Sequence, residues 1–367
     1  MVPISIEAGA VIVDVSINGR GPFPVMFDTG AQDTLTPETA AALGLKTEGS
    51  GTFQDSGGDR VAITFTRAVA MRLGDAEMTD QPFAVLGLPP YVTDRGSRPP
   101  LAGFIGYELL ARFAARLDYQ AKTLTLTLGQ DFRYRGIGVC VPLAFTGNIP
   151  AVPAAADGTT GRFVVDTGSS GALTLRREFV EAHDLQARHS AALRIKSVGA
   201  ARPFDAILVR LDRFDIAGSW IERPATRFAA IRGEGLPFTD ADGSIGYEIL
   251  RQFVITFDYP RHELWLEHSS AFGTRTGEGS AGFQAIKVEG GGFSVITVVP
   301  NTPAAAAGIR VGDLITDVDG LSTRSMSFSD FAGLMRRTAG TSLQLNTVRD
   351  GVARPVTLTL KDVGVLF

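Results

Sequence analysis

Apolar residues recur along this chain in short runs, and within many runs they alternate with polar residues. Four segments show the pattern: "AVIVDVSING" (10–19), "VAITFTRAVAMRLG" (61–74), "KTLTLTL" (122–128) and "AILVRLDRFDIAG" (206–218). A period of two, rich in Val, Ile, Thr and Phe and bounded by turn residues, is typical of β-strands. The chain is therefore predicted to be mostly β.

Two segments carry helix signals instead. In "TPETAAALGL" (36–45), Thr36 is a predicted N-cap, Pro37 suits the first turn and Gly44 suits the end of a helix. In "TLRREFVEAHDL" (174–185), Thr174 is the predicted matching cap. Both patterns predict short helices.

The chain also repeats itself. Residues 105–126 align without gaps to residues 245–266, an offset of 140, and ten of these 22 positions are identical. The tripeptide Asp-Thr-Gly follows an apolar run at Asp28 and again at Asp166, an offset of 138. Two landmarks with nearly the same period predict a tandem duplication, with copies at about 1–130 and 131–270. The Gly-, Ser- and Thr-rich segment 269–282 resembles a linker to a further region without a partner in the copies.

Composition excludes several classes of protein and site. The 367 residues are 44% apolar, which is enough for two or three domains. The net charge is −4, and nothing in the sequence suggests the basic stripe that is typical of nucleic-acid-binding proteins. Cys140 is the single cysteine, so no intramolecular disulfide can form, and a lone cysteine is most often a small buried apolar residue. The four histidines show no ligand spacing, so neither a metal nor another cofactor is expected.

The longest apolar runs are strand-sized, so no transmembrane segment is predicted. The first residues, "MVPISIEAGAVIVDV", show neither a basic region nor a long apolar core of a signal peptide. Two locations remain open: periplasmic or secreted if a signal preceded Met1, and cytoplasmic otherwise.

The duplicated tripeptide is where we expect the chemistry. A single Asp-Thr-Gly is typical of an ordinary strand-to-turn transition. If two copies pack about a pseudo-twofold axis, however, Asp28 and Asp166 face each other and share one proton. The charged carboxylate is then a general base toward water and the neutral one a general acid toward a substrate carbonyl.

The neighbouring residues suit such a pair. The hydroxyls of Thr29 and Thr167 can bond across the axis and hold the two loops. Gly30 and Gly168 let backbone N–H groups approach the carboxylates.

Both loops resemble those of a known family. "DTGAQDT" (28–34) and "DTGSSGALT" (166–174) resemble the active-site loops of aspartic proteases of the pepsin and retropepsin superfamily. "FIGYELL" (104–110) and "SIGYEIL" (244–250) resemble its apolar–apolar–Gly motif, although Ser244 replaces the first apolar residue of the second copy.

The resemblance implies roles for particular residues. It makes Asp28 and Asp166 catalytic, makes Thr29 and Thr167 the gripping threonines, and makes Gly106 and Gly246 the glycines that close the fold beneath the loops.

The resemblance also implies flaps over the cleft. "GTFQDSGGDRV" (51–61) is the candidate in the first copy, with its tip at Ser56, Gly57 and Gly58 and no tyrosine, as in retropepsins. "KSVGAARPF" (196–204) is the hairpin-like counterpart in the second copy. Whether one or both act as flaps is open, and either could be an ordinary surface hairpin.

The C-terminal region resembles the PDZ domains of bacterial proteases. "GGGFSVITVVPNTPAAAAGIRVGDLITDVDG" (290–320) carries the resemblance, with a one-turn helix stopped by Gly308 and an Asp-Gly turn. The module is expected at about 278–362, and Ser327 is the predicted cap of the helix "FSDFAGLMRR" (328–337).

The peptide-binding groove of this module is implied in turn. Its candidate residues form a carboxylate-binding loop and one helix face: Ser280, Ala281, Gly282, Phe283, Phe331, Leu334 and Met335. A peptide would add there as an extra strand. The apolar members could equally belong to the core of the module, and the module could pack on the protease without binding anything.

Together these features predict a mostly β protein with two tandem retropepsin-like acid-protease β-barrel lobes related by a pseudo-twofold, plus a C-terminal PDZ α+β module. The predicted function is an aspartic endopeptidase whose PDZ recruits peptide tails or protein substrates. The alternatives are an inactive adaptor with a working PDZ, and a dimer that pairs two first lobes. A monomer without nucleic-acid partners is favoured.

Overall fold

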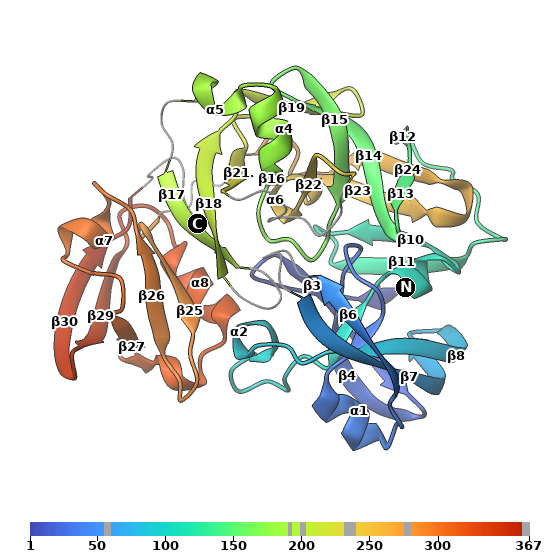
Figure 1. Cartoon of the computed structure of the whole chain (residues 1–367), viewed down its shortest axis with the longest axis horizontal. Coiled ribbons are helices and arrows are strands. Elements are labelled where there is room, and N and C mark those ends of the chain that lie inside the picture. The colour runs from blue at the N-terminus through green and yellow to red at the C-terminus, as the bar shows by residue number, and fades with distance from the viewer. Residues whose placement is uncertain (55–59, 190–192, 199–202, 231–239, 275–279, 362–367) are drawn as a thin grey trace. The chain divides into compact units, whose positions relative to one another are not determined.

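The structure, a computed structural model, describes residues 1–54, 60–189, 193–198, 203–230, 240–274 and 280–361. These residues form two compact units (Figure 1). The first takes its residues from 1–88, 101–192 and 198–274. The second takes its residues from 89–100, 193–197 and 275–367, so two short segments from within the predicted protease copies belong to the C-terminal unit.

The first lobe of the first unit is a sheet that closes on itself. Its strand order is β2-β3-β4-β9-β5-β8-β7-β6, and β3 also pairs with β7. The strands are β2 (Ser5–Glu7), β3 (Ala10–Ile17), β4 (Arg20–Phe27), β5 (Thr34–Leu35), β6 (Glu48–Gln54), β7 (Arg60–Leu73), β8 (Ala76–Val85) and β9 (Gly103–Ile105). Val11, Val13 and Val15 of β3 are buried, as the period of two predicts.

The second lobe repeats this arrangement. Its strands follow the order β18-β21-β16-β22-β15-β14-β19-β20, and β13 pairs with β14. They are β13 (Ala144–Thr146), β14 (Ile149–Ala156), β15 (Thr159–Val165), β16 (Leu173–Leu175), β18 (Pro203–Arg210), β19 (Arg213–Ile216), β20 (Ser219–Glu222), β21 (Ala225–Ala229) and β22 (Gly243–Ile245). In each lobe the strand before Asp-Thr-Gly lies parallel to a short strand that arrives from later in the lobe: β9 beside β4, and β22 beside β15.

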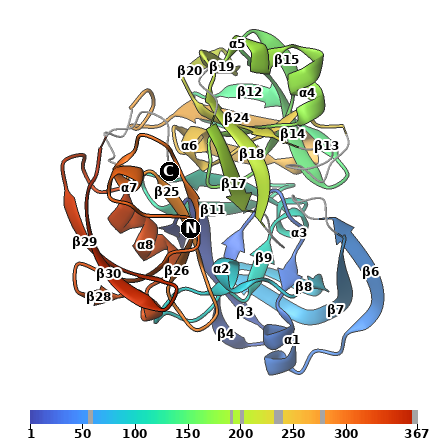
Figure 2. The ribbon, with the colours of Figure 1, turned by 60° about the vertical axis from the view of Figure 1, so that its left-hand side comes forward.

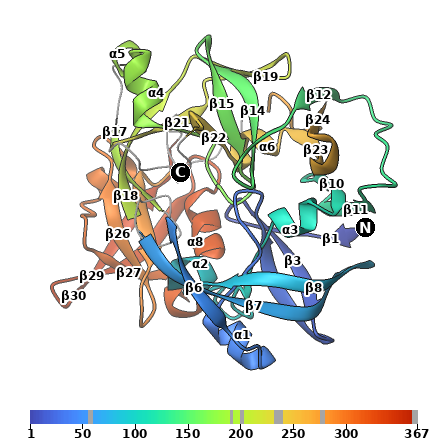
Figure 3. The same cartoon turned by 45° about the vertical axis from the view of Figure 1, so that its right-hand side comes forward.

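A six-stranded sheet built from both copies joins the lobes (Figure 3). Its strands are β1 (Val2–Pro3), β11 (Thr123–Leu128), β10 (Phe113–Asp118), β23 (Phe253–Asp258), β24 (Glu263–His268) and β12 (Val139–Pro142). At its centre β10 pairs antiparallel with β23, with Ala115 opposite Phe257 and Leu117 opposite Ile255. These two pairs exchange under the offset of 140 residues, as a twofold axis between the copies requires.

Short helices complete the first unit. They are α1 (Pro37–Leu43), α3 (Tyr107–Leu110), α4 (Arg177–Ala182), α5 (Leu185–Arg188), α6 (Tyr247–Leu250) and the 3-10 turn η1 (Tyr259–Arg261). The prediction for α1 is confirmed: Thr36 is its N-cap, and Gly44 ends it with φ of 69°. The predicted cap Thr174 is wrong. Thr174 lies inside β16 between β21 and β22, and Arg176 precedes α4 without a side-chain cap.

The second unit contains a smaller sheet (Figure 2). Its buried side chains form a separate apolar core. The strand order is β25-β26-β27-β29-β30, and β28 pairs with β27. The elements are β25 (Phe283–Lys287), β26 (Phe293–Val298), α7 (Pro303–Ala306), β27 (Leu314–Val318), β28 (Leu321–Ser322), η2 (Thr323–Ser325), α8 (Phe328–Met335), β29 (Ser342–Arg349) and β30 (Val352–Thr359). The unit also includes α2 (Pro90–Thr93) and all of β17 (Leu193–Val198) except its last residue. Ser327 caps α8 as predicted, and Gly308 follows α7 with φ of 78°.

Two expectations need correction. Cys140 is exposed rather than buried, because it lies on β12, which is the edge strand of its sheet. The start of the predicted linker is not free chain either: Ser269 donates its amide to Gln252 O at 2.9 Å, and the rings of Phe272 and His268 stack at 3.6 Å. Residues 275–279 lie outside the described part.

Within the described ranges, no helix is both long enough and apolar enough to cross a membrane.

Candidate active site

The two Asp-Thr-Gly loops begin where β4 and β15 end. The amide of Asp28 donates to Ile105 O at 2.9 Å, and the amide of Asp166 donates to Ile245 O at 3.0 Å. Each aspartate is thus fixed by the short strand that lies beside its own strand. The same contact therefore recurs in both lobes.

Gly106 and Gly246 lie directly under the loops. A Cβ atom on Gly106 would lie 2.2 Å from Asp28 O and 2.3 Å from Ala31 O. On Gly246 it would lie 2.5 Å from Gly171 O and 2.7 Å from Ser169 O. Only glycine permits these approaches of backbone to backbone.

The threonines form a reciprocal set of hydrogen bonds between the lobes. Thr29 N donates to Thr167 Oγ1, and Thr167 N donates to Thr29 Oγ1, both at 3.0 Å. Thr29 Oγ1 in turn donates to Val165 O at 2.6 Å, and Thr167 Oγ1 donates to Phe27 O at 2.8 Å. Both threonines are fully buried, so these four bonds fix one loop against the other without competition from water.

The carboxyl groups of Asp28 and Asp166 lie close together. A Cβ atom on Gly168 would lie 2.4 Å from Asp28 Oδ2, and a Cβ atom on Gly30 would lie 2.8 Å from Asp166 Oδ1. Gly30 N donates to Asp28 Oδ1 at 2.8 Å, while Gly168 N and Ser169 N donate to Asp166 Oδ1 at 2.9 and 3.2 Å. Each aspartate also keeps part of its surface exposed, which leaves access for a ligand.

Burial sets the ionisation of this pair. It raises the pKa of Asp28 well above the ordinary value for aspartate, and the charge of Asp166 raises it further. Burial also raises the pKa of Asp166, but the bonds from Gly168 N, Asp28 and Ser169 N oppose that rise. The pair therefore retains one proton to a higher pH than isolated aspartates would.

Two buried tyrosines extend the pseudo-symmetry beneath the dyad. Tyr119 and Tyr259 are 4% exposed, and among the described residues neither hydroxyl has a hydrogen-bond partner. Burial raises the pKa of both, and each also feels an aspartate of the other lobe: Asp166 for Tyr119 and Asp28 for Tyr259. These tyrosines were not singled out from the sequence, although both lie in the repeated "DY" of the aligned segment.

Asp33 is a further buried acid of the first loop that the sequence reading missed. It is 1% exposed, its Oδ1 accepts from Gly106 N at 2.8 Å, and its Oδ2 accepts from Gln81 Nε2 at 2.8 Å. Its own amide donates to Glu108 Oε2 at 2.7 Å. Burial, followed by the charge of Glu108, raises the pKa of Asp33 well above the usual range. A carboxyl group thus holds the glycine that supports the Asp28 loop.

In the second lobe the glycine beneath the loop has a different hydrogen-bond partner. Gly246 N donates to the backbone oxygen of Ala172 at 2.9 Å, where Gly106 N donates to a carboxylate. The absence of a side chain on Gly171 leaves space for Arg227, whose Nη1 would lie 2.1 Å from a Cβ on Gly171. The glycine beneath each loop is therefore held by a carboxyl group in the first lobe and by a backbone carbonyl in the second.

The candidate flaps are only partly described. β6 and β7 form a hairpin, with Thr52 opposite Ala62 and Gln54 opposite Arg60, but the tip residues Ser56, Gly57 and Gly58 lie outside the described residues. In the second copy β17 and β18 are described, whereas 199–202 between them are not. The flap roles remain predictions.

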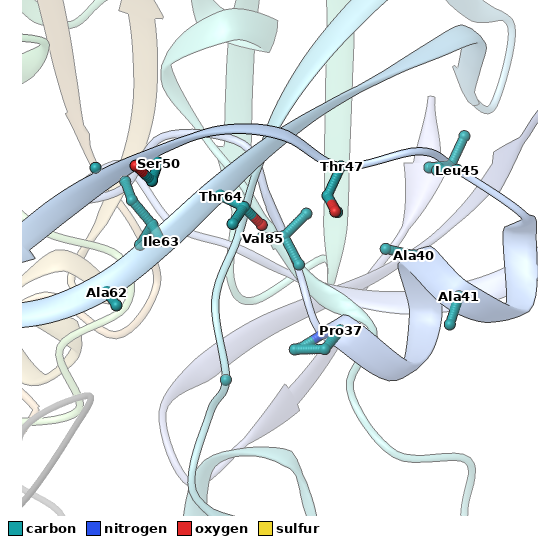
Figure 4. Close-up of a pocket in the computed structure, with 12 residues that line it drawn as sticks. Pro37, Ala40, Ala41, Leu45, Thr47, Ser50, Ala62, Ile63, Thr64 and Val85 are labelled. Carbon is teal, nitrogen blue, oxygen red and sulfur yellow. The ribbon is translucent and has the colours of Figure 1, made fainter.

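A largely apolar cavity of about 530 Å³ lies in the first lobe beside this hairpin (Figure 4). Residues of α1, β6, β7 and the end of β8 line it, among them Pro37, Ala40, Leu45, Ile63 and Val85. It contains none of the residues of the Asp-Thr-Gly loops.

In the C-terminal module, most predicted groove residues contribute to the core. Ala281, Phe283, Phe331 and Met335 are at most 7% exposed, and Phe331 stacks on the ring of Phe293 at 4.0 Å.

The loop before β25 is tightly built, and one groove candidate is less buried. Ser280 Oγ accepts from Gly282 N at 3.1 Å, and Gly282 has φ of 81°. A Cβ atom on Gly282 would meet Thr302 Oγ1 at 2.2 Å. Leu334 is partly buried against the core. Ligand contacts at this groove remain predictions.

Family comparisons agree with this architecture. The aspartyl protease family model matches residues 13–109 and 152–249, one segment in each lobe, and a PDZ domain model matches residues 294–349.

Two protease relatives match shorter stretches. The magnetosome formation protease MamE of Paramagnetospirillum magneticum is 40% identical over 76 residues, or 21% of this chain and 10% of its own length. A carboxy-terminal-processing protease of Bartonella bacilliformis is 31% identical over 75 residues, or 20% of this chain and 17% of its own. The chain therefore spans only a small part of either relative.

Among solved structures, the aspartic proteinase of Irpex lacteus aligns with a TM-score of 0.48 at 15% identity, over 74% of this chain and 98% of that one. The photosystem II D1 C-terminal processing protease aligns with a TM-score of 0.24 at 26% identity, over 26% and 27% of the two chains. Because the aspartyl protease model covers more than half of the sequence, with one match in each lobe, the chain belongs to the aspartyl protease family and carries a C-terminal PDZ domain.

Proposed function

We propose that this protein is an aspartic endopeptidase that hydrolyses peptide bonds with water activated by Asp28 and Asp166. The observation that carries the proposal is the half-buried carboxyl pair, in which each aspartate lies beside the glycine of the other duplicated loop. Two carboxyl groups in contact that share one proton supply both an acid and a base.

The different environments of the two aspartates suggest their roles. We assign the role of base to Asp166, whose Oδ1 accepts from Gly168 N and Ser169 N, so that it takes a proton from the attacking water. Asp28 holds the shared proton and donates it to the carbonyl oxygen, which gives a neutral tetrahedral diol. When the C–N bond breaks, Asp166 gives its proton to the leaving nitrogen and Asp28 recovers one from a hydroxyl of the diol.

The surrounding bonds keep the pair in place during these transfers. The four threonine bonds fix the distance between the loops, and the amides of Gly30 and Gly168 orient the carboxylates. Such preorganisation lets proton transfer proceed without a preceding rearrangement.

The PDZ module has a separate proposed role. β25 is the terminal strand of its sheet, so its outer edge is available for an added peptide strand. The module would bind apolar C-terminal tails, with the loop Ser280–Phe283 holding the terminal carboxylate, and deliver tailed substrates to the dyad.

The direct test replaces each aspartate with its neutral isostere. Asp28→Asn and Asp166→Asn should each lower hydrolysis of a short peptide at least about a thousandfold, because acid and base cannot substitute for each other. Circular dichroism should show the wild-type fold in both variants. Asp75→Asn, at an exposed turn of the first lobe, is the matched control and should retain full activity.

The rival function, an inactive adaptor, predicts a different result. It expects no hydrolysis by the wild-type protein at any pH, together with normal binding of tails. Substantial turnover by either single variant would refute the dyad itself.

A further inference from the structure

The second unit includes a segment that the sequence assigned to the first protease copy. Residues Pro89–Pro100, which contain α2, belong with the PDZ module rather than with the lobe from which they come. Three of these residues contact the rest of the module. Gly96 does so through its backbone, and Arg98 and Asp94 do so through their charged side chains.

The backbone contact is made by Gly96. This glycine has φ of 69°, and a Cβ atom on it would lie 2.4 Å from Ser325 O and 2.7 Å from Ser327 N. The chain therefore rests directly on the residues that lead into α8, and any side chain at this position would push the two apart.

The charged contacts lie on either side of Gly96. Arg98 Nη2 donates to Ser327 Oγ at 2.9 Å and to Asp330 Oδ2 at 3.3 Å, so it reaches the capping residue of α8. Asp94 Oδ2 lies 3.5 Å from Nζ of the buried Lys287, the last residue of β25. The segment thus joins the end of β25 to the start of α8.

This position matters because β25 and α8 are the two elements between which the proposed tail site lies. They run side by side: the rings of Phe283 and Phe331 are 6.3 Å apart at one end, and Lys287 Nζ bonds to Met326 O at the other. A tail whose carboxylate binds before Phe283 would add along β25 toward Lys287, since an added strand follows the edge that it pairs with. It would arrive at the place that Asp94 and Arg98 occupy.

The other inserted segment, β17, contacts a different part of the module. The amide of Lys196 donates to Gln284 Oε1 and Thr297 Oγ1, each at 3.2 Å, and these two residues face each other across β25 and β26. That contact lies on the face of the sheet rather than at the end of β25.

We infer that Pro89–Pro100 is an internal ligand of the PDZ module: it closes the Lys287 end of the site, so a long tail must displace it whereas a short tail need not. The inference rests on the tail-binding role proposed for the module. Displacement is feasible because the Arg98–Asp330 pair is exposed, at 38% and 58%, and such pairs contribute little to stability.

The experiment compares two synthetic peptides that share one apolar C-terminus, one of about four residues and one of about ten, since β25 has five residues. Calorimetry at neutral pH measures their affinity for the full chain and for Arg98→Ala and Gly96→Ala. Arg67→Ala removes another exposed arginine–aspartate pair, at 2.9 Å in the first lobe, and is the control for the first variant. Gly44→Ala is the control for the second, because Gly44 has the same φ of 69° with nothing within 4 Å of the added Cβ.

The expected result is that both segment variants bind the long peptide at least about threefold more tightly than wild type does. Weaker contacts of the segment raise the fraction of molecules in which the Lys287 end of the site is open. The affinity of both segment variants for the short peptide, and both controls, should match wild type. If every variant bound each peptide as tightly as wild type does, the inference would be overturned, while the tail-binding role of the module would stand. Weaker binding of the long peptide by Arg98→Ala would overturn it too, since Arg98 would then belong to the tail site.

Binding of neither peptide by any protein would remove the tail site and the inference together. Hydrolysis of a short peptide, measured in parallel, reports on the dyad independently of all these outcomes.

Discussion

At the scale of single residues, hydrogen bonds distinguish two aspartates that the sequence presents as equivalent. Asp166 Oδ1 accepts from two consecutive amides, Gly168 and Ser169, whereas Asp28 Oδ1 accepts from Gly30, and burial followed by the charge of Asp166 raises the pKa of Asp28. The two carboxyl groups titrate as a coupled pair, in two steps that belong to the pair as a whole.

The pH dependence of activity follows. The pKa of Asp28 is raised, so the singly protonated pair persists above the ordinary range for aspartate and is lost as pH rises through that higher value. We expect kcat/KM for a short peptide to peak on the acid side of neutral and to fall about tenfold per pH unit above it, since one proton is lost. A profile that rises into the alkaline range would contradict a carboxyl dyad.

Asp33 gives a stability prediction with a definite sign. Its pKa is raised on folding, so its contribution to the free energy of unfolding is largest below the unfolded pKa, about 3.9, and is lost as pH rises through the folded value. Asp33→Asn cannot ionise. In urea titrations, wild type should therefore lose stability relative to this variant between mildly acidic and neutral pH. A difference independent of pH would show that Asp33 does not titrate there.

Some residues were predictable because their signals are local. Thr36, Pro37 and Gly44 define α1 within one turn of chain, and the repeat placed Asp28 opposite Asp166. Asp33 was missed because its partners Gln81 and Glu108 lie 48 and 75 residues away. A local sequence pattern does not predict a contact between residues that are far apart in the chain and meet only after folding.

At the scale of elements, the apolar–apolar–Gly motif correctly predicted that the end of β9 lies against the Asp28 loop. Thr174 shows the opposite case: its local pattern indicated a cap, yet pairing of β16 with two neighbouring strands placed it in a sheet. Segment 89–100 also had no signal of its own, because its partners lie more than 180 residues further along the chain.

Gly106 allows this approach to be tested. Gly106→Ala places a methyl group 2.2 Å from Asp28 O, so we expect a loss of about 2–3 kcal/mol in stability from overpacking, and about a hundredfold loss of activity from displacement of the loop. Gly87→Ala has open space around the added Cβ and should behave as wild type in unfolding and peptide assays. Normal activity in Gly106→Ala would mean that the loop does not depend on this contact.

At the scale of the whole molecule, one apolar core runs through both lobes and a separate one fills the module. The antiparallel pairing of β10 with β23 joins the lobes at the backbone, so they are expected to unfold as a single cooperative unit. The module has its own sheet and core, and its bounds of about 278–362 remain a prediction.

Two core truncations test this division by scanning calorimetry. Ile255→Ala removes a fully buried side chain of β23 and should destabilise only the two-lobed unit, by about 2–5 kcal/mol. Phe293→Ala does the same in the module, where about 3–5 kcal/mol is expected. Each substitution should lower the Tm of one transition and leave the other in place. A shift of both transitions by either variant would show a single cooperative molecule.

The duplication on one chain has a consequence for inheritance as well as for structure. A homodimer receives every substitution twice, at symmetry-related places, whereas here a codon change alters one half alone. A single chain can bind Gly106 through the Asp33 carboxyl group and Gly246 through the backbone oxygen of Ala172, a difference that two identical subunits cannot have. Its two halves can therefore specialise for the two ends of an asymmetric polypeptide, and no dilution can separate them.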